Sequence, residues 1–160
     1  MNPTITQLQQ KLGLLQQLYT LLTSSKSFKF YKFCLNYLGV DASPRDLAKD
    51  MVGCAETVTT LLDNFMGFQI ILGTATLESV LATSRQFVPV VNPEPGCIII
   101  SPTGSGNGTI EGHTGIVGMN GQILSNDSYT GKFSANWSIK TWTEYYHVKG
   151  GLPVYYYKLI

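Results

Sequence analysis

Cys54 is the residue of this sequence with the clearest potential for covalent chemistry. It follows Gly53 in the stretch DMVGCAETVTTLL (residues 50–62) and stands directly before apolar residues with helical spacing. A cysteine attacks as the thiolate, and the free N–H groups and dipole of a helix N-terminus favour that charge. The same N–H groups can stabilise the oxyanion of an acyl intermediate. We therefore expect a nucleophile at a helix N-terminus, with a small, inert buried cysteine as the alternative.

His113 is the candidate for the base that such a nucleophile needs. It opens the strand HTGIV directly after a glycine-rich loop, residues 101–112. Along a strand it shares a face with Gly115, so nothing bulky shields the imidazole on that side. The alternative is a structural histidine in the sheet. The second histidine, His147, is interpreted as a surface or capping residue.

The return strand of the hairpin carries polar residues that can accept the imidazole N–H and orient the ring. The candidates are Ser125, Asn126 and Asp127. A two-residue Asn-Gly turn aims Asn126 toward His113, whereas a bulged turn with one more residue aims the other two there. We favour the two-residue turn. The predicted catalytic residues are therefore Cys54, His113 and Asn126.

The order of these motifs resembles the NlpC-like and CHAP superfamily, papain-like cysteine peptidases and amidases that cut bacterial peptidoglycan. The resemblance covers roughly residues 40–160 and is greatest to short bacteriophage or phage-derived members. It is carried by VGCAETV, PGCIIISPTGSGNG, GHTGIVG, ILSNDSYTGKF and TWTEYYHVKGGLPVYYYK. It implies Cys54 as nucleophile, His113 as base and a polar residue of the SND segment as orienter. The superfamily uses His, Asn, Glu or Asp as the third residue, so the resemblance leaves that residue open.

The function that the resemblance implies is cleavage of an amide bond of peptidoglycan, by an endopeptidase or an amidase of the endolysin type. The expected partner is therefore the bacterial cell wall. The alternative is a non-catalytic virion or wall-binding module that keeps the peptidase fold. The first residues lack the basic segment and cleavage site of a secretory signal, and no apolar run is long enough to span a bilayer. We expect a protein of the bacterial cytoplasm before release, or one associated with the virion.

The chain pattern predicts an α+β, papain-like fold in which helices precede an antiparallel sheet. Helices are expected over residues 4–24, about 28–38, from Cys54 to about Phe65, and over 74–84, with a short one after Ser43. Strands are expected within 95–102, 113–128 and 142–159, the last preceded by a short helix. We divide the chain into a helical extension, residues 1–38, and a peptidase domain, residues 39–160. Helix 4–24 is expected to pack against that domain, with self-association as the alternative.

Composition limits the other classes of function. The chain has 160 residues, of which 44% are hydrophobic and 13% charged, and a net charge of +1, which argues against nucleic acid as a partner. Its three cysteines contain no CxxC pair, so neither a disulfide framework nor a zinc site is indicated. The glycine-rich loop lacks the Lys-Ser/Thr ending of a phosphate loop. We expect no cofactor and no metal.

Overall fold

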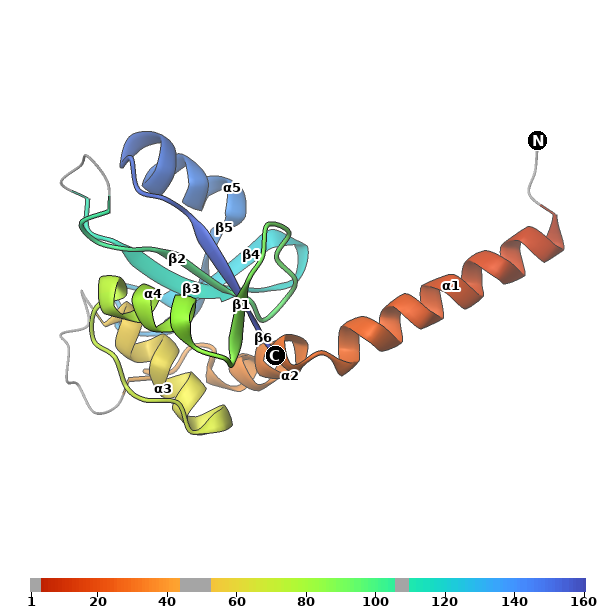
Figure 1. Cartoon of the computed structure of the whole chain (residues 1–160), viewed down its shortest axis with the longest axis horizontal. Helices are drawn as coiled ribbons and strands as arrows, with labels where there is room; N and C mark the ends of the chain where they lie inside the picture. The colour runs from red at the N-terminus through yellow and green to blue at the C-terminus, as the bar shows by residue number, and fades with distance from the viewer. Residues whose placement is uncertain (1–3, 44–52, 106–109) are drawn as a thin grey trace.

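Six antiparallel strands form one sheet with helices on both of its faces (Figure 1). The computed structural model describes residues 4–43, 53–105 and 110–160. The helices are α1 (Ile5–Ser24), α2 (Lys26–Cys34), η1 (Leu35–Tyr37), α3 (Cys54–Met66), α4 (Thr74–Thr83), η3 (Met119–Gly121), α5 (Ile139–Trp142) and the π-helix η4 (Thr143–Lys149). The strands are β1 (Phe87–Pro89), β2 (Ile98–Ser101), β3 (His113–Val117), β4 (Gln122–Asn126), β5 (Phe133–Ser138) and β6 (Tyr155–Leu159). The predicted α+β class, with helices before an antiparallel sheet, is confirmed. The helix expected after Ser43 lies outside the described residues.

The sheet has the strand order β1-β6-β2-β3-β4-β5, and its central strands are covered on both faces. Because side chains alternate along a strand, Ile98 and Ile100 face one core while Ile99 faces another. The first core lies against α2, α3 and α4, and the second against α5 and η4 (Figure 1). This alternation decides which neighbours each residue of β3 and β4 meets.

Helix α3 carries Cys54 on a firmly anchored element. Its apolar stripe, Val58, Leu61 and Leu62, is fully buried against the sheet. The helix ends at Gly67, whose φ of 73° is a left-handed conformation that glycine adopts without steric cost. The prediction of a helix from Cys54 to about Phe65 is confirmed to within one residue.

The boundary expected at residue 38 lies too far along the chain. Phe30 and Cys34 of α2 are fully buried, and the Phe30 ring lies 5.2 Å from that of Phe65 in α3. The aromatic side chains of α2 thus belong to the core of the domain. Only α1 stands apart: it has no buried residue, and it extends away from the rest of the molecule (Figure 1). The expectation that this helix packs against the domain is wrong.

No helix among the described residues is both long enough and apolar enough to cross a bilayer.

Candidate active site

Cys54 is the first residue of α3, as the sequence predicts. The first helical hydrogen bond runs from the N–H of Thr57 to the carbonyl of Gly53, at 2.8 Å. The N–H groups of Cys54 and Ala55 therefore lie outside the hydrogen-bond ladder of the helix. The backbone N–H groups of Thr114, Ala55 and Cys54 lie close enough to the sulfur to favour its charged form and so act to lower the pKa of the Cys54 thiol, Thr114 most of all. Because Thr114 follows His113 in β3, this contact brings the thiol against the start of that strand.

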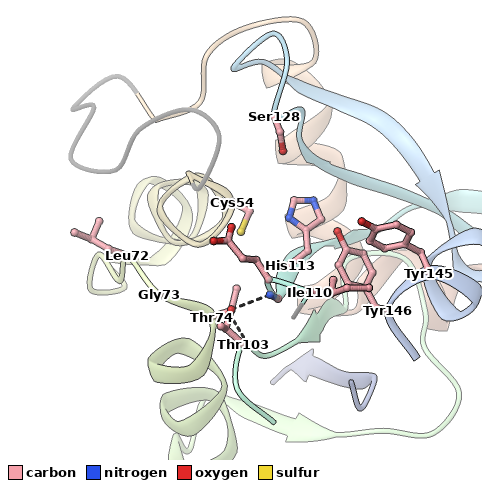
Figure 2. A pocket seen from close by; sticks show the side chains of 12 residues that line it. Cys54, Leu72, Gly73, Thr74, Thr103, Ile110, His113, Ser128, Tyr145 and Tyr146 are labelled. Atoms are coloured by element: carbon pink, nitrogen blue, oxygen red, sulfur yellow. Dashed lines mark hydrogen bonds between the residues drawn. The ribbon is translucent and has the colours of Figure 1, made fainter. Parts of the chain in front are cut away.

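Cys54 and His113 line one cavity of about 510 Å³, and Figure 2 shows the thiol and the imidazole ring beside each other. The cavity also receives Thr74, Thr103 and Glu111. Thr103 connects two parts of the cavity wall. The Thr103 hydroxyl lies 3.0 Å from the Thr74 hydroxyl and accepts the N–H of Gly112 at 2.8 Å. The two residues predicted to carry the chemistry are thus brought together at the end of the sheet, next to the α3 N-terminus.

The imidazole of His113 is held by a chain of two side chains. Its Nε2 lies 3.0 Å from the hydroxyl of Ser125, and this hydroxyl donates to Oδ1 of Asn136 at 2.7 Å. The amide of Asn136 is itself oriented, because its Nδ2 donates to the carbonyl of Asn126 at 3.5 Å. Since the Ser125 proton is used toward Asn136, its oxygen accepts the Nε2–H of His113. The proton thus sits on Nε2, and Nδ1 is left as the lone pair that can take a proton from Cys54.

Ser125 rather than Asn126 contacts His113 because of the turn between β3 and β4. Gln122 makes two backbone hydrogen bonds across the turn. Its N–H donates to the carbonyl of Met119, and its own carbonyl accepts the N–H of Gly118 at 2.7 Å. Gly118 and Met119 therefore both lie opposite Gln122, and this two-against-one pairing is a β-bulge.

The bulge sets the register with Ile116 opposite Leu124 and Val117 opposite Ile123. The Asn-Gly turn favoured from the sequence forms, but the register expected from it is wrong, because the neighbouring bulge gives the register of the bulged alternative. In this register Ser125 lies opposite Gly115, on the face of the sheet that carries the His113 ring. Because side chains alternate along β4, Asn126 points to the opposite face from Ser125, and the hydrogen bond to the ring is made by Ser125; Asn126 still lines a smaller cavity together with His113.

Gly115 makes the contact between Ser125 and His113 sterically possible. A Cβ at Gly115 would lie 3.0 Å from the Cβ of Ser125 and 2.7 Å from the carbonyl oxygen of Leu124. Any larger residue would therefore push β4 away from β3. The glycine that leaves the imidazole unshielded also lets the serine approach it.

Asn136 is a member of the site that the sequence did not reveal. It is the extra residue of a second bulge, because Ile123 pairs with Trp137 while Leu124 pairs with Ala135. A bulge re-aims a side chain at the edge of a sheet. Here it brings the Asn136 amide onto the hydroxyl of Ser125. Nothing in the sequence around Asn136 signals this irregularity.

Aromatic rings fix the plane of the imidazole. The His113 ring stacks on Trp142 with centroids 5.1 Å apart and on Tyr146 at 5.8 Å, with interplanar angles of 23° and 22°. The Trp142 indole is anchored in turn, since its Nε1 donates to the hydroxyl of Ser101 at 3.0 Å. Tyr146 belongs to the π-helix η4, a type of irregularity often found at functional sites. The ring of His113 is therefore positioned by packing as well as by hydrogen bonds.

Burial opposes charge on both reacting groups. It raises the pKa of the Cys54 thiol to about 11, despite the three backbone N–H donors, and the negative charge of Glu111 acts in the same direction. It lowers the pKa of His113 to about 4. The sequence suggests a thiolate stabilised by the helix N-terminus, but the burial of the pair favours neutral thiol and neutral imidazole at rest. Such an arrangement is chemically suited to general-base catalysis, in which the proton is transferred as the sulfur attacks.

The remaining candidates lie outside this arrangement. His147 is exposed, and its Nδ1 lies 2.9 Å from the carbonyl of Leu152, in agreement with the predicted surface or capping role. Cys34 and Cys97 are fully buried and free. Within the described ranges, no three His, Cys, Asp or Glu side chains gather in a way that could hold a metal ion.

A comparison with protein-family models found no matching family, and no curated protein matched the chain. What the protein does must therefore be inferred from its own site.

Proposed function

We propose that this protein is a papain-like cysteine hydrolase that cleaves amide bonds of bacterial peptidoglycan through an acyl-thioester. Cys54 is the nucleophile and His113 the general base. The observation that carries the proposal is the shared cavity in which the thiol, at a helix N-terminus, meets an imidazole whose Nε2 is already bound by Ser125.

In the first half-reaction, Nδ1 of His113 takes the thiol proton while the sulfur attacks the carbonyl carbon of the amide. The carbonyl oxygen becomes an oxyanion, which the N–H groups at the start of α3 stabilise. The imidazolium then donates its Nδ1 proton to the departing amine, and the C–N bond breaks. The products of this stage are the free amine and a thioester on Cys54.

In the second half-reaction, water replaces the amine in the cavity. Nδ1 takes one proton of the water as its oxygen attacks the thioester carbon. Collapse of this intermediate releases the carboxylic acid and returns the proton to sulfur. Throughout, Ser125 and Asn136 keep the imidazole in one orientation by accepting its Nε2–H and passing on the hydrogen bond.

The substrate class is supported by the motifs VGCAETV and GHTGIVG, which resemble those of peptidoglycan hydrolases of phage type. The form of the cavity agrees with an extended polymer substrate. A second cavity of about 210 Å³ shares His113 and Tyr146 with the first, so a bound chain can continue past the imidazole on both sides. We place the protein in the bacterial cytoplasm before lysis or in the virion.

The proposal is tested by incubating purified peptidoglycan with the pure protein and identifying the released fragments by mass spectrometry. We expect soluble muropeptides in which one type of amide bond has gained a water molecule. A new sugar–peptide cut identifies an amidase, and a cut within the peptides an endopeptidase. Binding to the wall without any release of fragments contradicts the hydrolase and identifies the non-catalytic wall-binding module.

Ser125→Ala is expected to lower kcat/KM by roughly 10- to 100-fold, because the Nε2–H of His113 loses its acceptor in a buried site. Ser79→Ala is the matched control, since this serine is exposed on α4 and lines neither cavity. It should leave kcat/KM close to that of wild type. Rates of muropeptide release measure both, on protein shown by circular dichroism to be folded. A larger loss in Asn126→Ala would restore Asn126 as the orienting residue.

A positioning role for Ser125 and Asn136 can also be tested through the dependence of the rate on pH. In Asn136→Asp, a carboxylate at the end of the chain stabilises the imidazolium, so the acid limb of the rate profile should move upward from about pH 4. A purely structural role for Asn136 would leave that limb where it is.

A further inference from the structure

Helix α1 is a long apolar helix with no partner among the described residues of its own chain. Eight of its large apolar side chains are between 51% and 76% exposed. They are Ile5, Leu8, Leu12, Leu14, Leu15, Leu18, Tyr19 and Leu21. Figure 1 shows the helix as a rod that leads away from the domain, with the N-terminus at its far end. Most of the stability of a helix in a protein comes from packing of its apolar face, so a covering partner would stabilise α1 considerably.

The spacing of these residues is that of a coiled-coil seam. Six apolar positions alternate at intervals of three and four along the whole helix. They are Ile5, Leu8, Leu12, Leu15, Tyr19 and Leu22. Such a heptad pattern keeps one stripe facing a neighbouring helix, and identical helices fit one another because each supplies the same knobs and holes. The pattern therefore favours a second copy of α1 as the partner.

Charge and area agree with that partner. Lys11 is the sole charged residue of α1, so two copies repel each other little, and the helix lacks the basic face that draws amphipathic helices to anionic lipid. Each of the eight side chains is more than half exposed, so much apolar surface is free to enter an interface, of which each partner in a standard stable complex buries about 800 Å².

We propose that the protein self-associates through α1, with the heptad seam of each copy packed against that of its neighbours. The additional row formed by Leu14, Leu18 and Leu21 flanks the seam and lets one helix touch two others. Copies joined in this way carry several domains on one stalk, so that binding of one domain to a polymeric substrate raises the effective concentration of the others. The association itself does not depend on the proposed hydrolase activity.

The test is the solution mass of the full chain, measured by light scattering after size-exclusion chromatography at micromolar concentration. We expect a mass of at least twice 17.6 kDa for the wild type. The variant Leu12→Glu/Leu15→Glu places charges in the seam and should be monomeric. The matched variant Thr6→Glu/Thr20→Glu adds the same charges on the side of the helix that carries neither row of apolar residues, and it should keep the wild-type mass.

Two results would overturn the proposal. One is a monomeric wild type, and co-sedimentation of such a monomer with phosphatidylcholine vesicles would assign the helix to a lipid surface instead. The other is an oligomer whose mass is unchanged in Leu12→Glu/Leu15→Glu, since another surface would then hold the copies together. Thermal unfolding followed by circular dichroism checks that the domain is intact in every variant.

Discussion

Cys54→Ala, His113→Ala and the double variant should all lose muropeptide release to the same residual level. Residues that act as one unit are not additive: without the base the thiol stays protonated, and without the thiol the base has nothing to activate. The expected loss is roughly 10⁴- to 10⁶-fold in kcat for each variant. Single-turnover release of fragments from purified peptidoglycan measures it, with excess enzyme to reach the low rates.

Cys97→Ala is the matched control for this series. Cys97 is fully buried, as is Cys34, and neither lines the cavity that holds Cys54. Removal of its sulfur should cost some stability and leave the rate close to that of wild type. If Cys54→Ala kept a rate within tenfold of wild type, the nucleophile would be another group and the assignment of the site would fail.

The second large effect is the dependence of stability on pH that His113 imposes. Burial lowers the pKa of this residue from its ordinary value of 6.5 to about 4. Between these two values the unfolded chain binds a proton at this residue and the folded protein does not. The free energy of unfolding therefore falls as the pH decreases from 6.5 to 4, by about 3 kcal/mol in total at about 1.4 kcal/mol per pKa unit.

Urea unfolding at pH 7, 6, 5 and 4 measures this contribution when wild type is compared with His113→Gln. For each protein the free energy of unfolding is plotted against pH. The difference between the slopes of the two plots is the contribution of His113, because the carboxylates that titrate near pH 4 are common to both proteins. His147→Gln retains His113 and should keep the steep fall of the wild type. Equal slopes in wild type and His113→Gln would show that the imidazole is charged or solvated in the folded protein.

The sequence was sufficient to predict most of the elements and to single out Cys54 and His113, which line one cavity. The long helix at 4–24, the helix that starts at Cys54 and the strand that starts at His113 follow from apolar spacing and from the glycines beside them. The pairing of Cys54 with His113 followed from chemistry, since a thiol and an imidazole are the groups that this type of catalysis requires. These are local signals, and the structure preserves them.

What the sequence did not predict depends on two bulges and on long-range packing. The extra residue opposite Gln122 moves Ser125 to the His113 face, and the bulge at Asn136 supplies the next hydrogen bond. An Asn-Gly turn has the same sequence signature with or without a neighbouring bulge, because the choice depends on how β4 packs between β3 and β5. The extent of the domain was missed for a similar reason: Phe30 becomes core only when α3 folds against it.

The protonated resting state of Cys54 has a consequence for how easily this sulfur is oxidised. Peroxides convert thiolates to sulfenic acid far faster than thiols, so oxidative damage to a cysteine follows its degree of ionisation. With a pKa of about 11, this sulfur exists almost wholly as the thiol at neutral pH. In the proposed mechanism the sulfur gains its reactivity only when His113 takes its proton during attack on the amide carbonyl. A nucleophile of this kind keeps its reduced form in aerated surroundings that inactivate permanently ionised cysteines.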